Sequence, residues 1–160
     1  MSVVAFPRDK GFTLIELMVT VALIAIVALV AVPAFANLIQ SQRAIAQSNL
    51  LLSAVALART EAIRLNAPVR VSALTGGATG WCVHTTATCT DASRLQQHEL
   101  PATIEVNDWE NMMFDGQGRR ALPAANNLHI VVRVAGCNGD RARRVTIAPI
   151  GQGSVRGWAC

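Results

Sequence analysis

The feature that most limits how this chain can fold is an uncharged apolar segment near its beginning. The 26 residues from Leu17 to Gln42 include no Lys, Arg, Asp or Glu. A helix needs about 20 apolar residues to cross the hydrocarbon of a bilayer. A secretory signal peptide has an apolar core of only about 7–15 residues, which ends at a small-residue cleavage site. This segment is longer and leads directly into more helical sequence, so we predict a membrane-spanning helix.

The helical pattern continues beyond the apolar segment. Apolar residues recur there at intervals of four, three, four and three positions, which is the spacing of a single helix face. This set is Leu51, Val55, Ala58, Ala62 and Leu65. A stop is predicted at Asn66-Ala67-Pro68, because the residue before a proline avoids the α conformation. We expect one helix from Phe12 to about Asn66, with a lipid-facing first half and an amphipathic second half that covers a soluble domain.

The sequence after the helix changes to short β-type patterns. Leu128, Ile130, Val132 and Val134 alternate with other residues, which predicts a strand with one buried face. Similar runs occupy 69–74, 102–107 and 143–150, and turns are predicted at 75–80, 115–118 and 136–140. The chain is therefore predicted to be an α+β protein without a second domain, in which the long N-terminal helix packs on an antiparallel sheet.

A carboxylate lies at the start of the apolar segment. A charge at this place is costly and usually functional, although Glu16 could also simply lie at the water interface. The surrounding sequence, KGFTLIELMVTVALIAIVALVAVPAF from Lys10 to Phe35, resembles the N-terminal signature of type IV pilins and of the pseudopilins of type II secretion. The resemblance implies that a prepilin peptidase cleaves after Gly11 and methylates the new amine of Phe12. Glu16 would then pair with the Phe12 amine of a neighbouring subunit during assembly.

The resemblance also implies how the chain is organised. Residues 1–11 would be a leader peptide, 12–36 a transmembrane and assembly helix, and 37–160 a periplasmic globular domain that includes the amphipathic half of the helix. The implied fold is the pilin fold. The implied location is the bacterial inner membrane, crossed once, with incorporation into a pilus as a further step. Arg8 and Lys10 would keep the leader on the cytoplasmic side.

Four cysteines follow the membrane segment, and an even number in an oxidising compartment suggests two disulfides. They are Cys82, Cys89, Cys137 and Cys160. Of the three connectivities we favour Cys82–Cys89, which closes a small loop, and Cys137–Cys160, which fastens the C-terminus. A zinc site built from all four is the alternative, but the closely spaced cysteine pairs of such sites are missing, and we expect no metal.

The end of the chain resembles the FimT/GspH branch of minor pilins and pseudopilins. The stretches concerned are MMFDGQGRR, residues 112–120, and RRVTIAPIGQGSVRGWAC, residues 143–160. Three roles follow from this resemblance: a minor pilin that primes type IV pili, a purely structural pseudopilin H of a type II secretion system without DNA binding, and a DNA receptor for natural transformation. The implied partners are other pilins or pseudopilins, the prepilin peptidase and the inner membrane.

Positive charge is concentrated at the end of the chain. Residues 37–118 carry five arginines and seven acidic residues, a net charge of −2, whereas residues 119–160 carry seven arginines and one acid, a net charge of +6. In one interpretation Arg141, Arg143 and Arg144 form a solvated strand edge that discourages aggregation. In the other they bind the phosphates of double-stranded DNA. The arginines that would join them are Arg119, Arg120 and Arg156.

Some FimT proteins bind DNA through a Gly-Arg-x-Arg motif near the C-terminus. The matching stretch here is Gly153-Ser154-Val155-Arg156, so Ser154 replaces the first arginine of the motif. Trp158 lies near this stretch and is a candidate for stacking on a base. A tryptophan beside Cys160 is also a common packing residue.

Enzyme classes find no support in the sequence. It contains no G-x-S-x-G elbow, no P-loop and no H-E-x-x-H motif. His84, His98 and His129 are scattered, and the acidic residues on either side of Trp109 are expected to be solvated. We therefore expect no catalysis, no cofactor and no small-molecule substrate.

Overall fold

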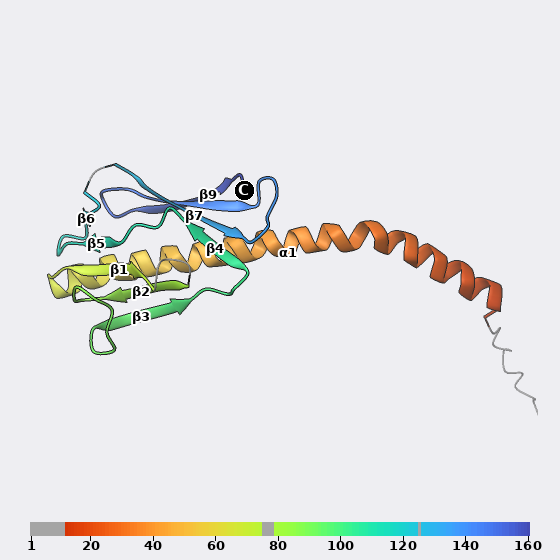
Figure 1. Ribbon diagram of the computed structural model, residues 1–160, viewed down its shortest axis with the longest axis horizontal. Helices are drawn as coiled ribbons and strands as arrows, with labels where there is room; N and C mark the ends of the chain where they lie inside the picture. Colours follow the sequence, from red (N-terminus) through yellow and green to blue (C-terminus); the bar gives the residue numbers. More distant parts are fainter. Residues whose placement is uncertain (1–11, 75–78, 125) are drawn as a thin grey trace, which may run out of the picture. The chain divides into compact units, whose positions relative to one another are not determined.

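The computed structural model describes residues 12–74, 79–124 and 126–160, and contains a long helix followed by short strands (Figure 1). The predicted leader, the cleavage residue Gly11 and most of the turn predicted at 75–80 lie outside these described residues. The helix is α1 (Leu14–Leu65). The strands are β1 (Val69–Ala73), β2 (Gly80–His84), β3 (Arg94–Glu99), β4 (Ile104–Asn107), β5 (Met112–Phe114), β6 (Arg120–Leu122), β7 (Leu128–Val134), β8 (Ala142–Ile147) and β9 (Gly153–Trp158).

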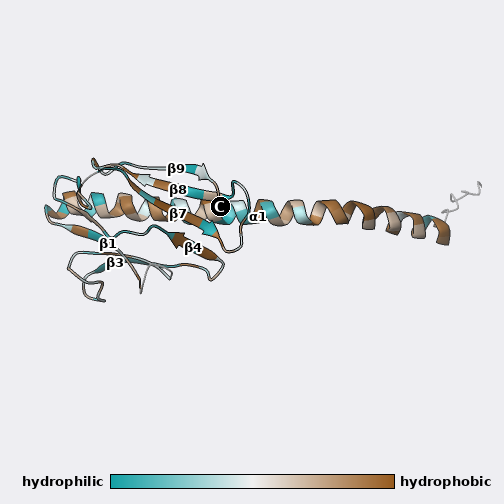
Figure 2. Ribbon diagram, turned by 45° about the horizontal axis from the view of Figure 1, so that its top comes forward, coloured by the Kyte–Doolittle hydropathy of each residue, from teal (hydrophilic) through white to brown (hydrophobic). Residues whose placement is uncertain are grey.

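The chain divides into two compact units, residues 1–38 and 39–160. In the described part of the first unit, the helix runs through Pro33 without a break. Its large apolar side chains from Leu14 to Leu38 are 51–78% exposed, and this stretch is mostly hydrophobic in Figure 2. By length and composition α1 can cross a membrane.

The second unit contains two antiparallel sheets, whereas the sequence predicted one. Sheet A has five strands in the order β3-β2-β1-β5-β6, and sheet B has four in the order β4-β7-β8-β9. Buried side chains from the second half of α1 and from both sheets form one hydrophobic core. The prediction of an α+β protein with a long helix on antiparallel strands is confirmed.

The helix face that covers this core is close to the predicted one. Leu51, Val55, Ala58 and Ala62 are buried, and small side chains at further positions let the strands approach the helix closely. These further buried positions are Ala44, Ser48 and Ala54. Leu65 was wrongly assigned to the buried face, because it belongs to the last turn of α1 and is 40% exposed.

The strand predictions hold where alternation was clear. Leu128, Ile130, Val132 and Val134 of β7 are all buried, as predicted. β2 was not predicted, because all five of its residues are buried and its sequence therefore shows no alternation.

Substitutions at two neighbouring leucines of α1 test the buried helix face. Leu51→Ala should reduce the free energy of unfolding by about 2–5 kcal/mol, because it leaves a cavity in the core. Leu50→Ala, at a position that is 40% exposed, should change it by only about 0.5 kcal/mol. Urea unfolding of the full chain in detergent micelles, followed by tryptophan fluorescence, measures both values. Equal losses would contradict the assignment of the core face.

Candidate assembly helix and nucleic-acid interface

The predicted assembly residues lie at the beginning of α1. Phe12 is 80% exposed, and Thr13 begins the helix by accepting a hydrogen bond from the Glu16 backbone N–H to its hydroxyl oxygen, 3.3 Å away. The Glu16 side chain is exposed and makes no hydrogen bond or ion pair with any residue that the structure describes. Its negative charge suits the first turn, where the helix dipole is positive. This carboxylate is therefore available to a partner outside the chain.

The C-terminal arginines do not form one continuous patch, because consecutive residues of an extended strand point to opposite sides. Arg143 donates a hydrogen bond from Nη2 to Ser41 Oγ of α1, at 3.1 Å. Arg141 likewise donates from Nη1 to Gln40 Oε1 of α1, at 3.1 Å. Arg144 lies on the other face of sheet B. The predicted grouping of Arg141, Arg143 and Arg144 in one surface is therefore wrong.

Two other predicted arginines do not line the pocket beside Arg144. Arg120 is only 3% exposed, and its guanidinium donates hydrogen bonds to the backbone carbonyls of Pro123 and Asn126. Burial lowers the pKa of Arg120, and the charge of Glu110 partly opposes this effect. Arg120 thus fastens the connection between β6 and β7 and is not available to a phosphate. Arg119 is exposed, in the turn before β6 of sheet A.

The outer face of sheet B brings together residues that the sequence analysis treated separately. In the β8–β9 hairpin, Arg144 lies directly opposite Arg156, and Ala142 lies opposite Trp158. The Arg144 guanidinium covers the Trp158 ring, with Cζ 2.9 Å from the ring centroid. We call Arg144, Arg156 and Trp158 the arginine face.

Polar groups surround the arginine face. A pocket of about 520 Å³ opens there, and it is lined by Asn127, Arg144, Thr146, Ala148, Gln152, Gly153, Ser154, Arg156, Gly157 and Trp158. Like charges directly opposite each other destabilise a sheet, yet neither Arg144 nor Arg156 forms an ion pair with a described residue. Arg144 Nε is buried and has no hydrogen-bond partner within the described ranges. An anion with several oxygens would satisfy these donors.

The two disulfides join the pairs that the sequence analysis favoured. Cys137–Cys160 ties the end of the chain to the turn between β7 and β8. Cys82–Cys89 ties the loop 85–93 to β2. No group of three potential metal ligands occurs among the residues that the structure describes.

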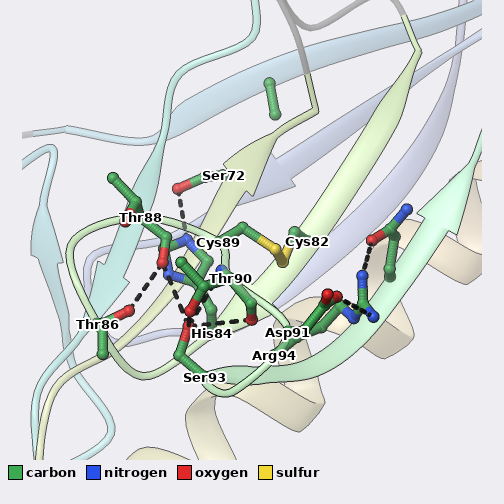
Figure 3. The surroundings of a disulfide bond; sticks show 12 residues. Ser72, Cys82, His84, Thr86, Thr88, Cys89, Thr90, Asp91, Ser93 and Arg94 are labelled. Atoms are coloured by element: carbon green, nitrogen blue, oxygen red, sulfur yellow. Dashed lines mark hydrogen bonds and ion pairs between the residues drawn. A yellow bond between two sulfur atoms is a disulfide. The ribbon is translucent and has the colours of Figure 1, made fainter.

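The loop closed by Cys82–Cys89 lies against a buried histidine. His84 is fully buried, and its Nε2 is 2.9 Å from Ser72 Oγ. Figure 3 shows hydroxyl side chains of the loop, among them Thr90 and Ser93, gathered beside the ring. Burial lowers the pKa of His84, a hydrogen bond with the Thr86 backbone acts in the opposite direction, and the charge of Arg70 lowers it further.

This burial predicts a pH dependence of stability. His84 remains neutral in the folded chain at pH values where the unfolded chain, with a pKa of about 6.5, becomes protonated. The contribution of neutral His84 to the free energy of unfolding should be fully present above about pH 6.5. It should decrease as the pH is lowered toward about 5. In His84→Gln the thermal unfolding temperature should depend less on pH over this range. In His129→Gln, at an exposed position, the pH dependence should stay as in the wild type. An unchanged slope in His84→Gln would rule out His84 as the source.

Comparisons with known proteins agree with this fold and with the N-terminal signature. Residues 47–151 match the family described as Type II transport protein GspH, and residues 6–32 match the prokaryotic N-terminal methylation motif. None of the curated proteins matches the chain significantly.

Two crystal structures of the type IV minor pilin FimU from Pseudomonas aeruginosa strain PAO1 are similar to the chain. In space group P21 the TM-score is 0.60 at 19% identity, over 72% of this chain and 89% of FimU. In space group P65 it is 0.55 at 19% identity, over 68% and 89%. At this identity the likeness shows the fold. The family match covers most of the chain, and with the methylation motif it shows that this protein belongs to the GspH family of minor pilins and pseudopilins, which are structural proteins and not enzymes.

Proposed function

We propose that prepilin peptidase cleaves this chain after Gly11, and that the mature chain assembles through α1 into a type IV pilus or a type II secretion pseudopilus. The observation that carries this proposal is the apolar surface from Leu14 to Leu38, which is exposed all round the helix. Side chains of this kind are stable in lipid or against similar helices of other subunits. On assembly, the helix moves from contact with lipid to contact with the helices of other subunits.

Glu16 gives the assembly its specificity in this proposal. A carboxylate in the hydrocarbon region needs a charged partner, and none is present among the described residues. The α-amine that cleavage creates on Phe12 of a neighbouring subunit supplies one. Methylation leaves this amine basic, so the pair keeps its opposite charges.

The same proposal places the parts of the chain in the cell. Residues 1–11 are the leader, held in the cytoplasm by Arg8 and Lys10. Residues 12–36 cross the inner membrane, and residues 37–160 lie in the periplasm. The two disulfides support this placement, because they persist in an oxidising compartment.

Glu16→Gln tests the assembly step. The variant should reach the inner membrane at the wild-type level but be depleted at least about tenfold from sheared filaments, because breaking a buried ion pair costs about 3–5 kcal/mol. Thr20→Ala is the control, since Thr20 donates only to the Leu17 carbonyl of its own helix. Quantitative immunoblotting of both fractions measures the effect. Normal incorporation of Glu16→Gln would refute the role of the carboxylate.

We propose DNA binding by the arginine face as a second function. The specific observation is the cross-strand pair of Arg144 and Arg156, two guanidinium groups with no ion-pair partner in the described chain. Arginine forks match phosphate oxygens, and phosphate contacts supply most of the affinity of proteins for DNA. Ser154 replaces one arginine of the resembling motif, and Arg144 on the neighbouring strand provides a second guanidinium at this place.

The division of the arginines between two faces provides a matched test. Arg144→Ala/Arg156→Ala should weaken binding of duplex DNA and reduce the slope of log affinity against log salt concentration by about 1.8, for two lost phosphate contacts. The control variant Arg141→Ala/Arg143→Ala removes the same charge from the side that faces α1. Its log affinity for DNA should keep most of its dependence on log salt concentration. Binding curves of the full chain between 50 and 200 mM salt, the range of the cited effect, decide this. Absence of binding at low salt would leave a purely structural pseudopilin or minor pilin.

A further inference from the structure

The four edge strands of the two sheets differ in how well they are protected against pairing with another chain. β6 has three residues and is followed by Pro123, and β4 has four. β3 carries charges at both ends and pairs irregularly with β2. β9 has six residues, one charge and no proline, and its pairing with β8 is regular. Short strands, prolines, charges and irregularities normally protect edges, so β9 is the unprotected edge.

The hairpin turn shows which backbone groups of β9 point outward. Ala148 N–H donates to the Gln152 carbonyl at 2.8 Å, and Gly151 N–H donates to the Ala148 carbonyl at 2.9 Å. Hydrogen-bonded and non-hydrogen-bonded pairs alternate along an antiparallel ladder. Counted from this turn, the N–H and C=O groups of Gly153, Val155 and Gly157 point away from β8. No described residue forms a backbone hydrogen bond with them.

A cleft runs beside the beginning of this edge, between β9 and α1. Its volume is about 560 Å³, and it is lined by Leu52, Ser53, Val55, Ala56, Arg59, Thr60, Gly151, Gln152 and Gly153. The exposed helix side chains there are small. Gly153 lies so close to Leu52 that a Cβ would collide with its side chain, so the floor of the cleft is shallow at this point. The cleft therefore leaves room for a further extended segment beside Gly153, at the beginning of β9.

The charges near this edge indicate which kind of segment would bind. Arg59 lies at the Gly151 end of the cleft, where its Nε donates to the Gly118 carbonyl at 3.0 Å. The Arg143 guanidinium lies beside Gly157 at the other end of β9, and Arg156 projects from the strand itself. Asp140 is the only acid from residue 119 onward. Carboxylates on the incoming segment would complement these charges.

We propose that the free edge of β9 docks an extended acidic segment of another filament subunit, which adds a fifth strand to sheet B beside α1. This inference rests on the proposed assembly with other subunits and adds a contact that the α1 helices do not supply. Strand addition gives affinity through the backbone and specificity through alternate side chains. A second copy paired through its own β9 would bring two Arg156 residues together, so an acidic partner fits better.

Gly157 offers a matched pair of variants. Gly157→Pro removes an outward N–H that the ladder with β8 does not use, and proline is tolerated at such edge positions. Gly157→Ala keeps the N–H, and its Cβ would only touch the flexible end of Arg143. Ala56→Glu provides a second, independent block, because it fills the cleft from an exposed helix position and repels carboxylates. Ala46→Glu, at another exposed position of α1, is its control.

The probe is a capped, fluorescent peptide of about seven residues in which Glu alternates with Val or Thr, together with the same peptide carrying Lys in place of Glu. Anisotropy with the full chain in detergent micelles should show binding of the acidic peptide, weakened at least about tenfold by Gly157→Pro and by Ala56→Glu. Gly157→Ala and Ala46→Glu should bind as the wild type. The Val155 amide should exchange more slowly with the peptide bound.

Three results would overturn the inference: no binding of the acidic peptide, equal binding of the Lys peptide, or equal binding by Gly157→Pro. Self-association of the chain that Gly157→Pro abolishes would also overturn it, since the occupant would then be a second copy. Peptide binding in micelles needs neither cleavage after Gly11 nor Glu16, so failure here is distinguishable from failure of helix-driven assembly.

Discussion

The rest of the structure depends on one helix, α1, which exposes its apolar side chains along the first stretch and packs against two sheets along the second. From Leu14 to Leu38, α1 exposes apolar side chains in all directions, which suits lipid or similar helices. Beyond this stretch it buries only one face, formed largely by alanines with Leu51 and Val55, under two sheets. The opposite face of the second stretch stays exposed and carries both polar side chains and apolar ones such as Leu50 and Ile63. The same continuous helix therefore leads from an exposed apolar segment into the core of a folded domain.

The alternation of strand residues decides which surfaces of that domain can function. Arg143 turns toward α1 and binds Ser41, while Arg144 next to it turns outward over Trp158. Neighbouring arginines in the sequence thus have two different roles. Arg143 links sheet B to α1, and Arg144 forms with Arg156 an outward pair that suits phosphate. β9 contributes to both the arginine face and the proposed docking edge, so DNA and a neighbouring subunit would approach the same hairpin from different sides.

The sequence alone predicted those elements in which a single hydrophobic pattern dominates. The helix end before Pro68, the buried face of β7 and the long apolar segment follow from local pattern, and the structure agrees with each. The division into two sheets was not predictable, because which strands pair depends on contacts between distant residues. Fully buried β2 shows no alternation. The opposition of Arg144 and Arg156 requires the register of the β8–β9 hairpin, for which the turn ending at Gly151 was the available signal. Burial of Arg120 depends on carbonyls of a later loop, which charge counting cannot reveal.

The mature N-terminus gives the most direct test of a processed, helix-assembled pilin. The chain should be expressed in a bacterium together with a prepilin peptidase, recovered from the inner membrane and analysed by intact-mass and N-terminal peptide mass spectrometry. We predict the loss of residues 1–11 and a single methyl group on the Phe12 amine. A chain that keeps residues before Phe12, or that is cleaved elsewhere, would leave Glu16 without its proposed partner and would contradict this mode of assembly.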